Sequence, residues 1–267
     1  MTIAADHYDQ LLARHYTWML GGDLTALATE QAHLLDSLGV EPTAAGTTAV
    51  DLGCGPGNQT LALAALGFTP VLAVDTSTTL LGELAAHTGG NAAIQPVHAD
   101  IRTVLPQITQ AGSVAVVVCM GDTLTHLPSM TDVTALLGDV TQALAEGGRL
   151  VITYRDLTRP LCGTDRFIPV RSTPDQLLTC FLEYRDDDTV IVHDLLHTRS
   201  GDTWTQQVGS YPKLRISADW LASQCQASGL TVQHHDTGPR GIRVLTATKL
   251  AATRASTTDP HRNHPSR

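Results

Sequence analysis

Residues 50–60, with the sequence VDLGCGPGNQT, constrain the fold of this chain more than any other segment. A buried strand is predicted to end at Leu52, and an alanine-rich helix is predicted over 59–66. The loop between them holds three alternate glycines, Gly53, Gly55 and Gly57. Glycines at this spacing allow a tight turn with positive φ and let a ligand press against the main chain. The following helix adds free N–H groups and a partial positive charge. Such a loop at the end of a parallel strand predicts a site for a nucleoside-containing cofactor.

The spacing of these glycines indicates which cofactor. A dinucleotide site requires G-x-G-x-x-G, but the sixth residue counted from Gly53 is Asn58. The segment instead shows D-x-G-x-G-x-G and resembles motif I of the class I S-adenosylmethionine (SAM) dependent methyltransferases. In that family the loop lies under the methionine part of SAM. The resemblance therefore implies cofactor contacts for Asp51, Gly53, Cys54, Gly55 and Gly57.

Two further strands are predicted to end in acids. Asp75 ends the apolar run 71–75 and can accept two hydrogen bonds from ribose hydroxyls, and the resemblance extends this contact to Thr76. Asp75 can also cap the helix that follows, and the two roles are compatible. In class I methyltransferases the acid after strand 3 bonds the adenine amino group and the next apolar residue packs on the ring. Asp100 and Ile101 match these places, although Asp100 can instead cap a helix.

The fourth and fifth predicted strands supply the catalytic candidates. The apolar run 114–119 is followed by Met120 and Gly121, for which the resemblance implies cofactor contacts. In this fold strand 4 ends beside the transferred methyl group. Asp122 and His126 follow that strand, while Tyr154 and Arg155 lie at the carboxyl end of strand 5. Asp122 or His126 can accept a proton, and so can Tyr154 when ionised.

A closer resemblance is to small-molecule methyltransferases of the glycine N-methyltransferase type. That group has G-N-S-x-x-H-L after strand 4, and this chain has GDTLTHL over residues 121–127. The group has an arginine beyond strand 5 that binds the substrate carboxylate, a place taken here by Arg155, and a Tyr-Pro-containing strand, matched by Tyr211. Asp122 replaces the asparagine of the group, which puts an amino-acid substrate in question. Arg155 can equally pair with Asp122 or Asp156 as a structural salt bridge.

Segments on either side of the core are predicted to cover the site. Helical periodicity over residues 3–38 predicts two helices, and the resemblance implies that they form a lid. Four lid residues are candidates for substrate binding: Tyr8, His15, Tyr16 and Trp18. For Trp18, packing of an amphipathic helix is an equally good explanation. Alternating and turn-rich patterns over 158–216 predict three antiparallel strands, and such insertions commonly carry substrate choice.

The chain is predicted to close with a helix over 217–228 and a hairpin whose loop holds Arg240, a further substrate-binding candidate. The predicted fold is α/β, a doubly wound Rossmann-like sheet of seven strands with the last strand antiparallel. A helical lid is predicted over 1–40, the SAM-binding core over 45–157 and 217–250, and a three-stranded insertion after strand 5. A disordered tail is predicted over 251–267.

Composition excludes several classes of function. The chain of 267 residues has 42% hydrophobic and 16% charged residues, which fits a globular domain. A net charge of −9 without a basic block disfavours nucleic acid. No apolar stretch approaches membrane length, and scattered cysteines without a signal sequence predict a reduced, cytoplasmic protein. The 12 histidines lack the spacing of a zinc site, so no metal is expected.

Three functions remain open from the sequence. The favoured one is methyl transfer from SAM to nitrogen or oxygen of a small polar metabolite. A macromolecule methyltransferase is disfavoured, because the nucleic-acid amino type requires N/D-P-P-Y after strand 4 and GDTL stands there. A SAM-binding sensor or scaffold without methyl transfer is the third. The expected partner is a small-molecule methyl acceptor, and a homo-oligomer is possible.

Overall fold

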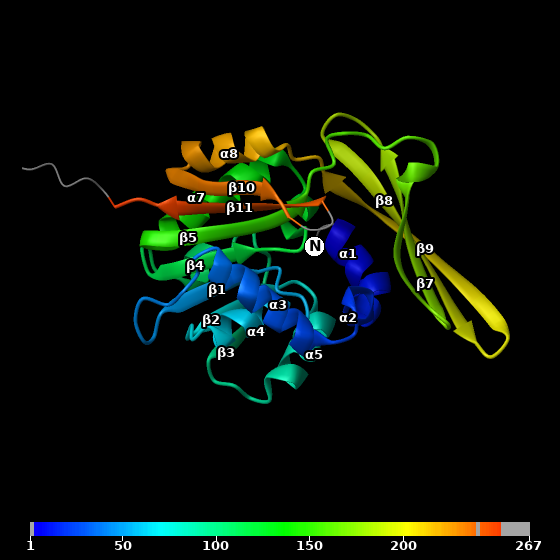
Figure 1. Cartoon of the computed structure of the whole chain (residues 1–267), viewed down its shortest axis with the longest axis horizontal. Coiled ribbons are helices and arrows are strands. Elements are labelled where there is room, and N and C mark those ends of the chain that lie inside the picture. The colour runs from blue at the N-terminus through cyan, green and yellow to red at the C-terminus, as the bar shows by residue number, and fades with distance from the viewer. Residues whose placement is uncertain (1–2, 239–240, 252–267) are drawn as a thin grey trace, which may run out of the picture.

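The computed structural model describes residues 3–238 and 241–251. A seven-stranded sheet flanked by helices forms the body, and a second, four-stranded sheet extends from one end of it (Figure 1). Short N-terminal helices lie between the two sheets (Figure 1). None of the described helices is long and apolar enough to cross a membrane.

The large sheet has the strand order β10-β11-β5-β4-β1-β2-β3. Its strands are β1 (Thr48–Leu52), β2 (Val71–Asp75), β3 (Ile94–His98), β4 (Val114–Cys119), β5 (Leu144–Arg155), β10 (Leu230–Thr237) and β11 (Ile242–Lys249). The first five are parallel, whereas β11 runs antiparallel to both β5 and β10. The predicted doubly wound sheet with an antiparallel last strand is therefore confirmed.

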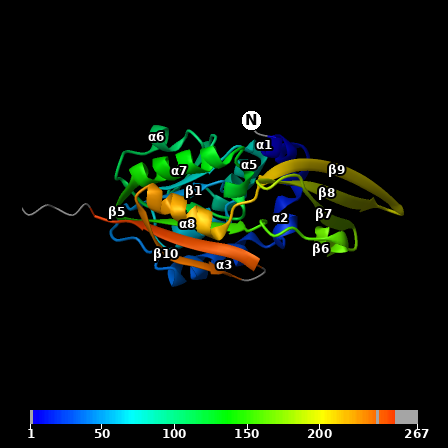
Figure 2. The ribbon, with the colours of Figure 1, turned by 90° about the horizontal axis from the view of Figure 1, so that it is seen from above.

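Helices cover both faces of this sheet because its central strands are apolar on both sides. Figure 2 shows α6 (Leu105–Ile108) and α7 (Met130–Ala143) on one side and α3 (Leu24–Ser37) on the other. The remaining layer helices are α4 (Asn58–Ala65), α5 (Thr78–Thr88) and α8 (Ala218–Ala227). One apolar cluster joins β4 and β5 to α7 and α8, and a second joins β1 and β2 to α3, α4 and α5. These two clusters hold the sheet between its helix layers and leave the carboxyl ends of the parallel strands at one edge.

The N-terminal segment is helical, as predicted, but the first expected helix is broken into short pieces. These are α1 (Ile3–His7), a π-helical turn η1 (Tyr8–Leu12), a 3₁₀ turn η2 (Ala13–His15) and α2 (Tyr16–Leu20). Gly21 and Gly22 follow with φ of 133° and 86°, and Asp23 then caps α3 by accepting from Ala26 N at 2.9 Å. Because α3 packs on the core sheet, only the pieces before Gly21 lie between the two sheets.

The insertion after β5 has four strands, so the predicted number of three was wrong. They are β6 (Phe167–Thr173), β7 (Gln176–Tyr184), β8 (Thr189–Ser200) and β9 (Thr203–Leu214), with a 3₁₀ turn η4 (Gly163–Arg166) before them. The sheet order is β6-β7-β8-β9 and every pair is antiparallel. β6 escaped prediction because Pro169 interrupts its pattern, which an edge strand tolerates. The predicted disorder after residue 251 lies outside the described residues.

Candidate active site

A pocket of about 790 Å³, counted with its open mouth, lies at the carboxyl ends of the parallel strands. Seven of the predicted cofactor residues line it: Gly53, Gly55, Asp75, Thr76, Asp100, Ile101 and Gly121. Three other predicted residues, Tyr8, Tyr16 and His126, also line it. In open α/β sheets ligands bind at this edge, so the position of the pocket is that of a ligand site in such folds.

The glycine loop after β1 is held tightly against its neighbours. The N–H groups of Gly53 and Cys54 donate to Val74 O at 2.8 and 2.9 Å, which ties the loop to β2. Gly53 has φ of 73°, and a Cβ there would lie 2.3 Å from Thr123 Cγ2. Gly57 has φ of 107°, and its Cβ would lie 2.3 Å from a methyl of Leu84. Only glycine fits at these two positions.

Asp75 accepts hydrogen bonds only from the backbone among the described residues. Its two carboxylate oxygens accept from Gly55 N and Ser77 N, both at 2.8 Å. Ser77, not Asp75, is the N-cap of α5. Burial raises the pKa of Asp75, and Asp9 nearby adds to the rise. A partly buried carboxylate with no cation beside it can accept further hydrogen bonds from a ligand in the pocket.

Asp100 and Ile101 both line the pocket. Both oxygens of Asp100 accept from the guanidinium of Arg102, Oδ1 at 3.1 Å and Oδ2 at 2.6 Å for its shorter contact. The Arg102 hydrogen bonds hold the pKa of Asp100 below its usual value. Ile101 is buried and offers an apolar side chain to the pocket. Asp100 is thus an ionised acceptor that is fixed in place by its neighbour.

Four predicted cofactor residues do not line the pocket: Asp51, Cys54, Gly57 and Met120. Asp51 is buried under the loop, and its carboxylate accepts from the Thr60 hydroxyl at 2.6 Å. Burial raises the pKa of Asp51 to about 7, against the lowering effect of the Thr60 hydrogen bond. Cys54 is a buried thiol whose pKa burial raises. Asp51 and Cys54 are therefore buried in the core beside the loop and do not face the pocket.

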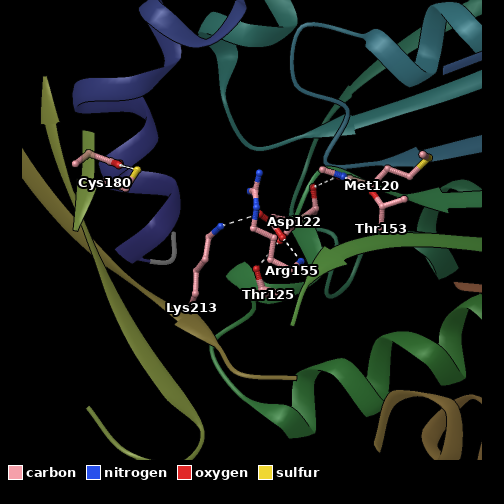
Figure 3. Close-up of polar contacts among 10 residues, drawn as sticks. Met120, Asp122, Thr125, Thr153, Arg155, Cys180 and Lys213 are labelled. Atoms are coloured by element: carbon pink, nitrogen blue, oxygen red, sulfur yellow. Dashed lines mark hydrogen bonds and ion pairs between the residues drawn. The ribbon is translucent and has the colours of Figure 1, made fainter. Parts of the chain in front are cut away.

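A charged cluster lies at the ends of β4 and β5 (Figure 3). Asp122, with φ of 76°, is buried, and its Oδ1 accepts from Arg155 N at 2.6 Å. Its Oδ2 accepts from Arg155 Nη1 at 2.7 Å and from Lys213 Nζ at 3.1 Å. Although burial acts to raise it, the two cations hold the pKa of Asp122 well below its usual value. The salt bridge that the sequence allowed between Arg155 and Asp122 is present.

Lys213 is the member of this cluster that sequence reasoning missed. It lies on β9 of the insertion, 91 positions from Asp122, and its side chain is 9% exposed, against 51% for Arg155. It is one of two lysines in the chain and follows Tyr211-Pro212 directly. The rarity of lysine in this sequence was the only signal that could have drawn attention to Lys213. Through Lys213 the insertion makes a charged contact with the core beside the pocket.

Polar groups of the β4 and β5 ends fix the turn that carries Asp122. Gly121 N donates to Thr153 Oγ1 at 2.8 Å, and Thr125 Oγ1 donates to Asp122 O at 2.7 Å (Figure 3). Gly121 has φ of 72°, and a Cβ there would meet nothing within 4 Å, so its open side is pocket space. Asp122 itself lies behind this turn, with Gly121 and Thr123 on the pocket wall.

His126 lies among aromatic rings at the pocket. Its ring centroid is 5.3 Å from that of Tyr8 and 5.4 Å from that of Tyr211. Its Nε2 is buried and has no hydrogen-bond partner among the described residues. Burial lowers the pKa of His126 to about 3, and Lys213 adds to the lowering against the opposing effect of Asp122. His126 is therefore neutral at ordinary pH. Burial raises the pKa of Tyr8, Tyr16 and Tyr211, which stay protonated.

Three predicted site residues lie away from the pocket, and a fourth is not described. His15 Nδ1 is 2.7 Å from Gln176 Nε2 of the insertion, and Trp18 lies under the Arg171 guanidinium. Tyr154 is fully buried and its hydroxyl is 3.2 Å from His235 Nε2. Burial raises its pKa, which opposes the ionised form that proton abstraction would need. Arg240 lies outside the described residues. The described part of the chain holds no cluster of three or more metal-ligating side chains.

Comparison with known proteins identifies this architecture. Residues 49–148 match the model of a methyltransferase domain. The CcbJ methyltransferase from Streptomyces caelestis is 18% identical, with a TM-score of 0.73 over 94% of this chain and 99% of that one. DesVI from Streptomyces venezuelae is 17% identical, with a TM-score of 0.67 over 93% and 99%. CalS10 from Micromonospora echinaspora, an amino pentose methyltransferase solved with SAM bound, is 14% identical, with a TM-score of 0.66 over 88% and 95%. No curated protein matches the sequence.

The sheet order, the glycine loop and the pocket at the strand ends define the class I methyltransferase fold. Together with the match over residues 49–148, they show a methyltransferase domain in the core of this chain, with the fold of the SAM-dependent enzymes among the similar structures.

Proposed function

We propose that this protein transfers a methyl group from SAM to a nitrogen or oxygen atom of a small polar acceptor in the pocket lined by His126. The observation that carries the proposal is the buried Nε2 of His126, which finds no partner in the described residues. A buried polar atom without a partner is costly, and a ligand that donates to it removes that cost. Because His126 stays neutral, its Nε2 can accept from an N–H or O–H group.

The residues of the pocket fit SAM. Asp75 is a partly buried acceptor without a cation, which suits ribose hydroxyls, and Ile101 offers an apolar surface for adenine. Asp100, fixed by Arg102, has carboxylate oxygens that can accept from the adenine amino group. Gly55 and Gly121 leave backbone exposed to the pocket where larger residues would intrude. Bound SAM supplies an activated methyl group, so the protein needs only to hold the acceptor in line with it.

The charged cluster favours an uncharged acceptor over a cationic one. Lys213 and Arg155 carry two positive charges against one negative charge on Asp122, so the end of β4 has a net positive charge. An ammonium ion is disfavoured beside it, and a neutral amine or a hydroxyl is not. Asp122 is held ionised by two cations and is therefore not a base at neutral pH. Its role in the proposal is to fix Arg155 and Lys213 beside the pocket.

The covering segments support a small acceptor. Tyr8 and Tyr16 line the pocket from the N-terminal helices, and Lys213 approaches it from the insertion. We assign SAM binding to 45–157 and 217–250, and acceptor choice to the flap formed by 158–216. Among the similar structures, CalS10 is an amino pentose methyltransferase and KedS8 from Streptoalloteichus a sugar N-methyltransferase. An amino sugar is thus the first acceptor class to test.

The first experiment is calorimetric titration of the purified protein with SAM and S-adenosylhomocysteine (SAH), with NADH as the control. Micromolar binding of both sulfur nucleosides and no binding of NADH is expected. Failure to bind SAM refutes the proposal.

A second experiment follows SAH release with amino sugars as acceptors. In the His126→Phe variant the transfer rate should fall about tenfold or more, since one hydrogen bond to the acceptor is lost. SAH affinity should stay within about twofold of the parent. An unchanged rate would exclude His126 from acceptor binding.

A further inference from the structure

A buried His–Asp pair joins the N-terminal helices to the insertion. His7 Nε2, at the end of α1, lies 2.8 Å from Asp194 Oδ2 on β8, and the two side chains are 5% and 2% exposed. The other oxygen of Asp194 accepts from Cys180 Sγ at 2.8 Å. Both carboxylate oxygens are therefore bonded by protein groups. The pair connects residues 187 positions apart, so it is a feature of the tertiary structure alone.

The insertion is shaped to receive the His7 ring. Gly209 is the partner of Asp194 in the β8–β9 register, and a Cβ on Gly209 would lie 2.6 Å from Cε1 and Nδ1 of His7. The imidazole stacks on Tyr211 with 4.7 Å between ring centroids. Any side chain at Gly209 would displace the imidazole, because the contact is with a ring held on both sides.

Apolar packing surrounds this polar contact. Leu11 and Leu12 of the N-terminal helices pack in one cluster with Leu178, Val192 and Tyr211 of the insertion. Figure 1 shows α1 against the insertion sheet. The same helices contact the core through Tyr16, whose ring edge lies near Gly55, and through Tyr8, whose ring meets His126. The pocket cover thus bridges the two sheets, and its buried polar anchor lies on the insertion side.

We propose that His7 and Asp194 are positioning residues that latch the N-terminal helices to the insertion, so that both segments open and close over the pocket as one unit. The inference rests on the proposed function, since it takes the pocket under Tyr8 to be the SAM site. If the helices separated from the insertion, Asp194 would remain buried without its main partner. Joint movement keeps this contact intact. It places Tyr8, the residue after His7, over the pocket whenever the insertion is closed.

The test compares the full-length parent with Asp194→Asn and Gly209→Ala by amide hydrogen exchange and SAH calorimetry. Asp194→Asn weakens the pair at one end, and Gly209→Ala displaces the His7 ring without changing an ionisable group. Exchange over residues 3–20 is expected to rise about tenfold or more in both variants, and SAH affinity to fall about tenfold. Exchange in β4 and β5 should stay unchanged. Val208→Ala, on the exposed neighbour of Gly209, is the matched control and should behave as the parent.

A double variant separates latching from a general loss of stability. A Cβ at Gly209 would lie 2.6 Å from the His7 ring and 3.3 Å from Leu11 Cδ2, so its main clash is with His7. Most of the effect of Gly209→Ala on SAH affinity should therefore be lost in a His7→Gln background. Additive losses in that background would overturn the latch, and so would unchanged exchange over residues 3–20 in the single variants. The proposed function is judged separately, from the parent alone: a parent that binds no SAH refutes it.

Discussion

Replacing Lys213 with methionine should destabilise the protein more than replacing Arg155, although Arg155 makes the shorter contact with Asp122. Both cations donate to Asp122 Oδ2, at 3.1 Å for Lys213 and 2.7 Å for Arg155. The Lys213 side chain is 9% exposed and that of Arg155 is 51% exposed. Breaking a buried pair from one side costs roughly 3–5 kcal/mol, whereas an exposed pair is worth about 1 kcal/mol or less. Because Arg155 and a backbone N–H still hold Asp122, we expect about 3 kcal/mol for Lys213→Met.

The assay is urea unfolding of both single variants at pH 7, with Asp122→Asn added to each. Asp122→Asn should recover about 2 kcal/mol in the Lys213→Met background, because it removes the buried charge left behind. The folded-state pKa of Asp122 is depressed, so this pair contributes stability above the unfolded pKa of about 4 and loses it at lower pH. The difference between parent and Lys213→Met should therefore shrink below pH 4. An Arg155→Met variant that loses as much free energy as Lys213→Met would refute the reasoning from burial.

Three other outcomes are expected. Gly53→Ala should unfold at a lower temperature than Gly121→Ala, because both glycines have positive φ but only a Cβ at Gly53 meets Thr123. Equal decreases in unfolding temperature would show that the contact with Thr123 relaxes. Asp75→Asn should weaken SAH binding by about 1–3 kcal/mol in calorimetry, because one ribose acceptor is lost, and unchanged affinity would contradict the ribose role. The folded-state pKa of Asp51 is raised to about 7, so the free energy of unfolding of the parent should fall as pH rises from 4 to 7. Asp51→Asn removes this titration, and its free energy of unfolding should depend less on pH over that range. Urea unfolding that gives the same pH dependence for both proteins would refute the prediction.

Much of the pocket wall was predictable because the signals are local. A glycine or an acid that directly follows an apolar run lies at a strand end, and the carboxyl ends of parallel strands share one edge of the sheet. Asp75 was chosen on this ground, whereas Gly55, Ile101 and Gly121 were chosen from the family resemblance, and all four line the pocket. The last strand's direction followed from the family resemblance and is confirmed.

The sequence of a short strand did not predict which of its two faces lies toward the ligand pocket. Tyr154 and Arg155 are neighbours at the end of β5, and both were named as catalytic candidates. Adjacent residues in a strand point to opposite faces. Tyr154 is buried beside His235, while Arg155 reaches Asp122. Packing on each side of the sheet decides between them, and that information is spread over α8, β10 and the insertion.

The sequence by itself predicted the class of fold, the edge of the sheet that carries the pocket and many of the residue types on that edge, because strand ends, glycine turns and acids at strand ends leave signals within a few residues. Only the tertiary structure decided how the site is closed. Lys213 meets Asp122 across 91 positions, and His7 meets Asp194 across 187. Neither pair leaves a periodic signal in the chain, since a single buried charge on each element is enough to form it. Contacts of this kind exist only once the two sheets and the helices between them have packed together.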